Sequence, residues 1–167
     1  MLTVEKLIKM LNMKLLPKEG GYYSETHRSA QVVPGSSLPE QYESDRSLST
    51  AIYYMLTPDT KSLLHRLPTD EIFHFYLGEP VLMLQLFPDG TVNTIILGQD
   101  LEAGHSIQVL VPKGVWQGSY LLEGGGFALM GTTMAPGFDF ADSEIGDKET
   151  LISLYPSHQD LIKRLTT

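Results

Sequence analysis

The sequence contains no cysteine, which excludes disulfide bonds, thiolate metal ligands and a cysteine nucleophile. Basic residues are also scarce, because 12 Lys and Arg face 20 Asp and Glu, for a formal net charge of -8. A surface with this charge repels phosphate backbones and anionic lipids. We therefore expect a protein that tolerates a reducing compartment and has no nucleic-acid partner.

Long hydrophobic runs are missing as well. No run approaches the roughly 20 apolar residues that span a bilayer, and lysines interrupt the apolar residues at the N-terminus, unlike in a signal peptide. We expect a cytoplasmic protein with no membrane partner. The 167 residues show no internal repeat and no change of composition, so residues 1–167 are predicted to form a single domain.

Short apolar runs separated by turn residues fill the chain after Leu48. They are AIYYML, SLLHRL, IFHFYL, VLMLQLF, VNTIIL, SIQVLV, VWQGSYLLE and FALMGTTM. Turn residues such as Pro88-Asp89-Gly90 lie between them, and Gly124 to Gly126 are predicted to form another hairpin turn. Runs of this length predict an all-β, antiparallel sandwich or barrel.

The ends of the chain differ from this pattern. Apolar residues recur at helical spacing behind Thr3, a predicted N-cap, and the Ser157-x-x-Asp160 pattern predicts the cap of a C-terminal helix. Between them, Tyr22 to Arg28 is predicted to be a strand. Residues 29–47 are rich in Ser, Pro, Gly and charge, which predicts a long loop or lid.

His65 and Glu71 are the first candidates for chemistry. Strand alternation places His65 and Leu67 on one face, and Glu71 on one face of the next strand with Phe73 and Phe75. The histidine and the carboxylate could therefore converge across a hairpin. If Glu71 is buried, its structural alternatives are a pair with Arg28, Arg66 or His65.

The spacing of these residues resembles the paired signatures of the cupin superfamily, H-x-H-x(3,4)-E-x6-G and P-x-G-x2-H. The matching residues are His65, Glu71, Gly78, Pro112 and Gly114. Leu67 and Gln117 replace two of the histidines in these signatures. A typical cupin metal site uses three His and one Glu, so the degenerate set His65, Glu71 and Gln117 is not expected to hold a transition metal tightly.

Most of the chain also resembles the uncharacterised cupin-5 group. The segments that carry this resemblance are residues 19–29, 49–56, 64–78, 111–117 and 135–145. The resemblance implies a jelly-roll β-barrel, also called a double-stranded β-helix, with short helices at both ends, and a homodimer formed through β-strands. It implies no particular reaction.

A more distant resemblance links the chain to the dTDP-sugar 3,5-epimerases, metal-free cupins with a histidine base and an R-G-x-F-x-E strand. Gly21, Tyr23 and Glu25 match the end of that pattern, whereas Gly20 stands where the phosphate-binding arginine would be. The lysine that stabilises the enolate would fall near Glu71, so the charge is reversed there. We therefore do not expect the usual epimerase chemistry.

These residues support three hypotheses. The first is a cupin that binds a small polar molecule, such as a sugar or nucleotide-sugar derivative, and isomerises or epimerises it without a metal. In it His65 is the base, Glu71 orients or shares its proton, and Tyr23, Glu25 and Gln117 are candidate ligand contacts. The second is a non-enzymatic binding or structural cupin, and the third a degenerate metal-dependent one. Whether the protein is an enzyme stays open.

Which face of the strand over residues 22–28 lines the barrel also stays open. Tyr23, Glu25 and His27 share one face of a regular strand, and Tyr22, Ser24, Thr26 and Arg28 share the other.

Overall fold

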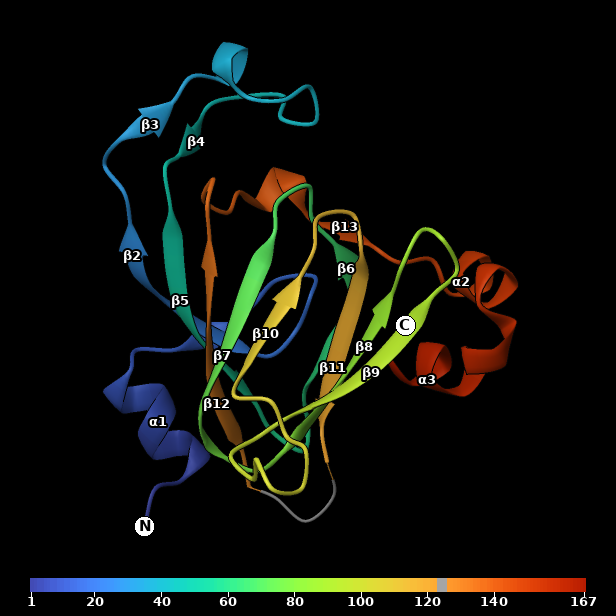
Figure 1. The fold of residues 1–167 in the computed structure, drawn as a ribbon. Helices are drawn as coiled ribbons and strands as arrows, with labels where there is room; N and C mark the ends of the chain where they lie inside the picture. Colours follow the sequence, from blue (N-terminus) through green and yellow to red (C-terminus); the bar gives the residue numbers. More distant parts are fainter. Residues whose placement is uncertain (123–125) are drawn as a thin grey trace.

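The computed structural model describes residues 1–122 and 126–167, which form two β-sheets that face each other (Figure 1). The six-stranded sheet has the order β1 (Lys14–Leu15), β2 (Tyr22–Arg28), β5 (Thr50–Leu56), β12 (Ala128–Met134), β7 (Glu71–Gly78) and β10 (Gln108–Val111). The five-stranded sheet has the order β13 (Glu144–Ile145), β6 (Lys61–Arg66), β11 (Trp116–Leu121), β8 (Val81–Leu86) and β9 (Val92–Leu97). All strand pairs within these sheets are antiparallel.

The eight apolar runs form strands β5 to β12, so the predicted all-β jelly-roll architecture is confirmed. The predicted strand from Tyr22 to Arg28 is confirmed as well. The predicted hairpin turn at Gly124 to Gly126 falls largely on residues 123–125, which lie outside the described residues.

The predicted hairpin between the strands of His65 and Glu71 is wrong. Strand β6 carries His65 in the five-stranded sheet, whereas β7 carries Glu71 in the six-stranded sheet. Residues 67–70 therefore connect one sheet to the other. The two side chains approach each other across the space between the sheets, because each strand pairs with partners distant in sequence.

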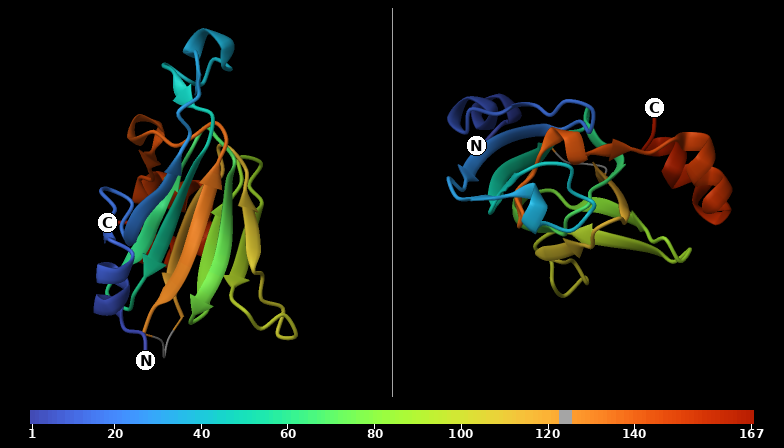
Figure 2. Two further views of the ribbon diagram at one scale, coloured as in Figure 1. Left: turned by 90° about the vertical axis from the view of Figure 1, so that its left-hand side faces the viewer. Right: turned by 90° about the horizontal axis from the view of Figure 1, so that it is seen from above.

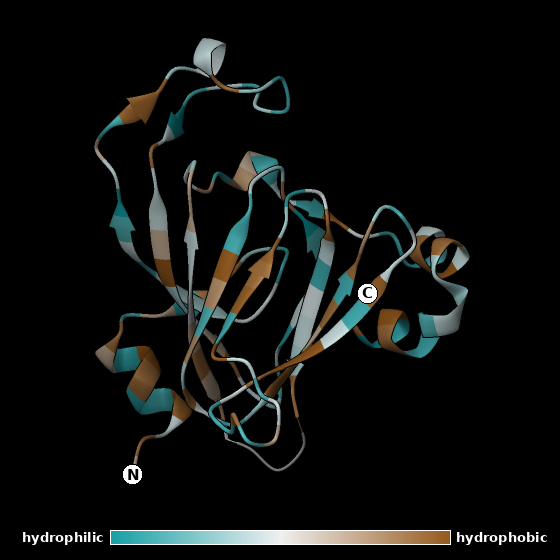
Figure 3. Ribbon diagram, in the orientation of Figure 1, coloured by the Kyte–Doolittle hydropathy of each residue, from teal (hydrophilic) through white to brown (hydrophobic). Residues whose placement is uncertain are grey.

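The main hydrophobic core lies between the sheets. Its largest buried members include Tyr54, Leu56, Phe73, Met83 and Met130. Outside the sheets, helix α1 (Val4–Met10) packs on the six-stranded sheet, while α2 (Lys148–Leu154) and α3 (Gln159–Arg164) pack on the five-stranded sheet (Figure 2). Brown and teal faces of these helices are visible in Figure 3, as expected for amphipathic helices that cover a sheet.

The helix ends confirm one predicted cap and correct another. Thr3 caps α1, because its hydroxyl accepts a hydrogen bond from the Lys6 amide at 3.3 Å. Ser157 does not cap the last helix: it lies within the 3-10 turn η3 (Pro156–His158), and His158 occupies the N-cap position of α3. The Ser157-x-x-Asp160 spacing is typical of a capped helix, but a capping residue usually has extended backbone. Here the 3-10 turn η3 leads directly into α3 instead.

Residues 29–47 form the predicted long connection, which we call the arm. It contains β3 (Val32–Val33), the 3-10 turn η1 (Gly35–Ser37) and β4 (Arg46–Ser47), and β3 and β4 pair with each other. The arm projects beyond one end of the sheets (Figures 1 and 2). Arg46 ties it down through an ion pair with Asp142 in which both side chains are buried.

The motif glycine Gly78 has a backbone role. Its φ of 106° is unfavourable for other residues, and a Cβ atom there would lie 2.3 Å from the Phe127 carbonyl oxygen. Gly114, with a φ of 77°, makes the turn that leads into β11. Among the described residues, no helix is long and apolar enough to cross a membrane.

Candidate functional site

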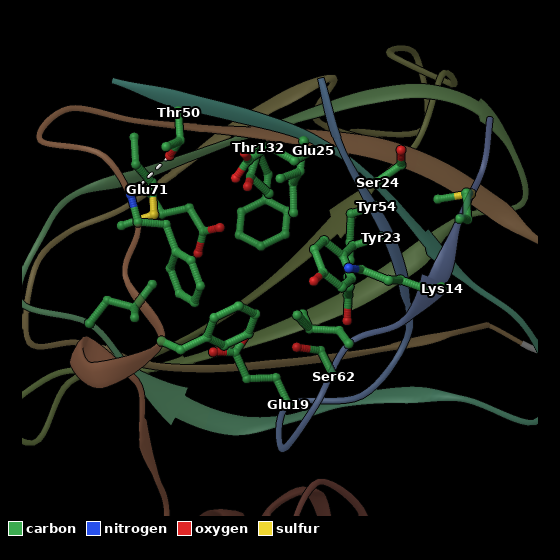
Figure 4. A pocket seen from close by; sticks show the side chains of 18 of the residues that line it. Lys14, Glu19, Tyr23, Ser24, Glu25, Thr50, Tyr54, Ser62, Glu71 and Thr132 are labelled. Carbon is green, nitrogen blue, oxygen red and sulfur yellow. Dashed lines mark hydrogen bonds between the residues drawn. The ribbon is translucent and has the colours of Figure 1, made fainter. Parts of the chain in front are cut away.

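A cavity of about 390 Å³ opens between the two sheets (Figure 4). Ligand pockets for small molecules occupy roughly 300 to 1,000 Å³, so the cavity is large enough for one. We call its deeply buried polar residues Glu19, His65 and Glu71 the floor; they are only 6%, 3% and 7% exposed. The floor thus joins one imidazole and two carboxylates.

The imidazole of His65 is held by the backbone of its own strand. Its Nδ1 lies 2.7 Å from the Leu63 carbonyl oxygen, which can only accept, so Nδ1 carries a proton. Its other ring nitrogen, Nε2, lies 3.6 Å from Glu19 Oε2. Nε2 is therefore the nitrogen that can take up or release a proton next to the cavity.

Glu19 is the floor residue that the sequence analysis missed. It lies in the tight turn before β2, where Gly20 and Gly21 have φ of 89° and 77°. Its backbone carbonyl accepts a hydrogen bond of 2.7 Å from the Leu63 amide, and its carboxylate accepts one from the Ser143 hydroxyl. The Gly-Gly pair was the available signal, since such glycines let the backbone turn sharply.

Glu71 reaches the cavity from β7 and is bonded by Gln117, whose side-chain amide donates to Glu71 Oε2 at 2.6 Å. Burial raises the pKa of Glu71; the charge that His65 carries when protonated and the Gln117 hydrogen bond oppose this, and the negative charge of Glu19 adds to it. The net direction is upward. Burial thus makes Glu71 a weaker acid than an exposed glutamate.

The predicted partners of Glu71 differ from those found. Arg28 pairs with Glu25, and Arg66 pairs with Glu144, so neither arginine neutralises Glu71. Of the three predicted alternatives, His65 is the one whose charge, when it is protonated, acts on Glu71. Gln117 lies directly opposite His65 in the β6–β11 pairing and does not line the cavity, so its contact with the site runs through Glu71.

Strand β2 lines the cavity with Tyr23, Ser24, Glu25 and Arg28. Tyr23 and Glu25 belong to one predicted face, and Ser24 and Arg28 to the other. Arg28 joins Tyr23 and Glu25 because a β-bulge between Glu25 and His27 inserts one residue and reverses the side-chain alternation after it. His27 consequently bonds Ser49 at the surface, and Arg28 joins the cavity.

We call the outer part of the cavity the mouth. It comprises Lys14, Tyr23, Glu25, Arg28, Phe138 and Phe140. Figure 4 shows Lys14 beside Tyr23 on one side of the cavity and Glu71 on the opposite side. Tyr23 and Phe140 pack edge to face, with ring centres 6.4 Å apart. The mouth is therefore aromatic and charged, whereas the floor is polar and closed.

The family model described as "Cupin superfamily (DUF985)" matches residues 5–146. The chain belongs to this family, Cupin_5. Among curated proteins, it is 34% identical over 135 residues to the uncharacterised protein YML079W of Saccharomyces cerevisiae. That match covers 75% of this chain and 66% of the yeast protein, slightly less than two thirds of its length.

Two solved structures resemble the Cupin_5 chain over its full length. A hypothetical protein from Leishmania major has a TM-score of 0.88 at 33% identity, covering 99% of both chains. A protein from Shewanella oneidensis has a TM-score of 0.86 at 34% identity, covering 100% of this chain and 99% of the other. Oxalate decarboxylase from Bacillus subtilis matches at a TM-score of 0.53 and 15% identity, over 92% of this chain and 37% of that one, which shows the shared fold alone.

The floor of this Cupin_5 protein does not fit a typical cupin metal site. Leu67 presents an apolar wall where the signature has a histidine, and the Gln117 amide is already bonded to Glu71. His65 Nδ1 is bonded to a carbonyl oxygen, which leaves one imidazole nitrogen. In the part of the chain that the structure describes, no group of three or more His, Asp or Glu side chains is arranged to hold a metal ion.

Proposed function

We propose that this Cupin_5 protein binds a small hydroxylated molecule, a sugar or nucleotide-sugar derivative, and isomerises or epimerises it by proton transfer without a metal. The observation that carries the proposal is the convergence of His65, Glu19 and Glu71 on one cavity from three different segments of the chain. All three line the cavity, and a hydroxylated ligand can bond their side-chain nitrogen and oxygen atoms.

The cavity walls favour a ring that has both hydroxyl groups and an apolar face. Ser62 and Thr132 add hydroxyl groups that can bond a sugar, while Phe73 and Tyr54 present flat apolar surfaces. The Tyr54 hydroxyl donates to the Gly20 carbonyl oxygen at 2.9 Å, which fixes its ring. Binding sites of this kind combine an apolar lining with a few fixed polar groups.

The floor offers a base and an acid for proton transfer. In the proposed step, His65 Nε2 takes a proton from the carbon next to a ligand carbonyl, and the C–H electron pair moves into an enolate whose oxygen the Glu71 carboxyl protonates. Return of one proton to carbon and one to Glu71 completes an isomerisation or epimerisation without an oxidant. A base and an acid that line the same cavity suit this chemistry.

Glu19 supports the histidine in this scheme. Its carboxylate lies 3.6 Å from His65 Nε2 and stabilises the imidazolium that forms when the nitrogen takes up a proton. Ser143 holds the other carboxylate oxygen in place.

The experiment is a screen of aldoses, ketoses, their phosphate esters and nucleotide sugars by thermal shift, followed by NMR detection of deuterium incorporated from D₂O into each ligand that binds. We expect His65→Ala and Glu71→Ala to abolish deuterium incorporation. His74→Ala is the matched control, because His74 bonds Thr133 and does not line the cavity.

Three other outcomes are informative. Binding without deuterium incorporation would leave a non-enzymatic binding cupin. No binding by any ligand would favour a structural role, in which the floor residues satisfy one another. A stoichiometric first-row metal lost in His65→Ala would favour the degenerate metal cupin instead.

A further inference from the structure

The charged side chains of the cavity are sorted by depth. Two carboxylates, Glu19 and Glu71, lie at the buried floor beside the single imidazole. The two cations that line the cavity, Lys14 and Arg28, both lie at the exposed mouth. An anionic group would therefore be repelled at the floor and attracted at the mouth.

Arg28 is held in position at the mouth by two kinds of contact. Its Nε and Nη2 donate to the Glu25 carboxylate, with Nη2 at 2.8 Å, and its Nη1 donates to the Phe138 carbonyl oxygen at 3.1 Å. A guanidinium has five N–H donors, and these contacts occupy one on each nitrogen. Two donors are left for a ligand.

A ligand anion can replace Glu25 as the partner of Arg28. Both side chains are 40% exposed, and exposed ion pairs contribute little to stability. A phosphate or carboxylate presents the same paired oxygens as Glu25, and Arg28 can bond it in the same bidentate geometry. Glu25 thus keeps the guanidinium at the mouth until a stronger anion replaces it.

Lys14 also lines the mouth and supplies a second positive charge. Its Nζ lies 5.2 Å from the centre of the Tyr23 ring, a distance at which an ammonium is attracted to the ring face. Lys14 belongs to β1, which pairs with β2 so that Lys14 is directly opposite Tyr23. Strand pairing therefore fixes Lys14 beside the strand that carries Arg28, opposite a residue five positions before it.

We propose that the mouth recognises an oxyanion group, a phosphate or a carboxylate, at the outer end of the ligand, with Arg28 as its contact and Lys14 as a second positive charge that attracts it. The inference rests on the proposed function, which sets the orientation of the ligand: its uncharged, hydroxylated part lies against the floor residues. It names a ligand class: sugars that carry a negative charge at one end.

The first test uses inorganic pyrophosphate, which needs no sugar site, titrated into the full chain by calorimetry. We expect Arg28→Gln to weaken binding by at least about tenfold, because charge-assisted bonds are lost. Glu25→Gln is expected to tighten it, since the competing carboxylate is gone. Arg66→Gln is the matched control: Arg66 forms a comparably exposed pair with Glu144 and does not line the cavity.

A second test compares each sugar that binds with its phosphate ester and its uronic acid, which separates phosphate from carboxylate recognition. The charged form is expected to bind at least about tenfold more tightly, and Arg28→Gln to abolish that preference. Equal affinities of neutral and charged forms, or a pyrophosphate affinity unchanged in both variants, would overturn the inference. Sugar binding that depends on His65 but not on Arg28 would overturn it while leaving the proposed function intact.

Discussion

The Gln117 amide and the Glu71 carboxylate form a buried hydrogen bond of 2.6 Å that joins the two sheets. Gln117 belongs to the five-stranded sheet and Glu71 to the six-stranded sheet. Since each side chain lies at a position of a cupin signature, the motif here provides a contact between the sheets in place of a ligand for a metal.

Replacing Gln117 by Leu is expected to destabilise the fold. The change leaves the buried Glu71 carboxyl without its donor, at a cost of about 1 to 3 kcal/mol in the free energy of unfolding. Urea denaturation measures this quantity. Gln108→Leu serves as the control, because Gln108 is exposed and should change the free energy by less than about 0.5 kcal/mol. Equal effects of the two changes would argue against a role for the bond in stability.

The raised pKa of Glu71 predicts a pH dependence of stability. The unfolded chain releases the Glu71 proton near its usual value of 4.5, whereas the folded chain keeps it to a higher pH. The stability contributed by the protonated group is thus complete below pH 4.5 and is lost as the pH rises through the folded pKa, by about 1.4 kcal/mol for each unit of pKa difference.

Glu71→Gln cannot ionise and should not show this loss. Urea unfolding of both proteins between pH 4 and pH 8 tests the prediction: the stability of the wild type relative to Glu71→Gln should fall as the pH rises. Parallel curves would show that the pKa of Glu71 is not raised in the folded protein.

The arm should depend on Arg46. Because Arg46 and Asp142 are 2% and 6% exposed in their ion pair, Arg46→Met leaves a buried carboxylate unpaired and should cost about 3 kcal/mol. We expect faster proteolysis within residues 29–47, measured by mass spectrometry. Adding Asp142→Leu to this variant should restore much of the lost stability, because it removes the unpaired carboxylate. If it does not, the arm is held by other contacts.

Chelation is expected to have no effect. Dialysis against EDTA should leave the unfolding midpoint and any sugar affinity unchanged, because the floor lacks two of the usual metal-binding histidines. Elemental analysis of untagged protein before and after dialysis checks this. A lower midpoint that a single added metal restores would contradict the prediction.

A dimer is expected in solution. Strand β10 is at the edge of the six-stranded sheet, and its Leu110 is 51% exposed; such an edge is commonly covered by another chain. Sedimentation equilibrium should give twice the chain mass of 18.6 kDa, and Leu110→Asp should shift it toward the monomer. A mass of one chain for the wild type would contradict the expectation.

The strands were predictable from the sequence because each one is a short apolar run bounded by turn residues. His65 and Glu71 were predictable as neighbours from motif spacing. The sheet that each belongs to was not, because β6 and β7 pair with strands far away in sequence. Glu19 was missed for a similar reason: a carboxylate in a Gly-rich turn is usually exposed, and only the packing of the turn against β6 and Ser143 buries it.

The β-bulge in strand β2 frees the charge of the mouth from strict strand alternation. Thr26 is the extra residue between Glu25 and His27, whereas His27 pairs with Ala51 and Arg28 with Thr50. Deleting Thr26 would leave both pairs in place, so Arg28 would still point inward and His27 outward. A one-residue deletion could therefore straighten the strand while the mouth keeps its cation and every floor residue stays the same.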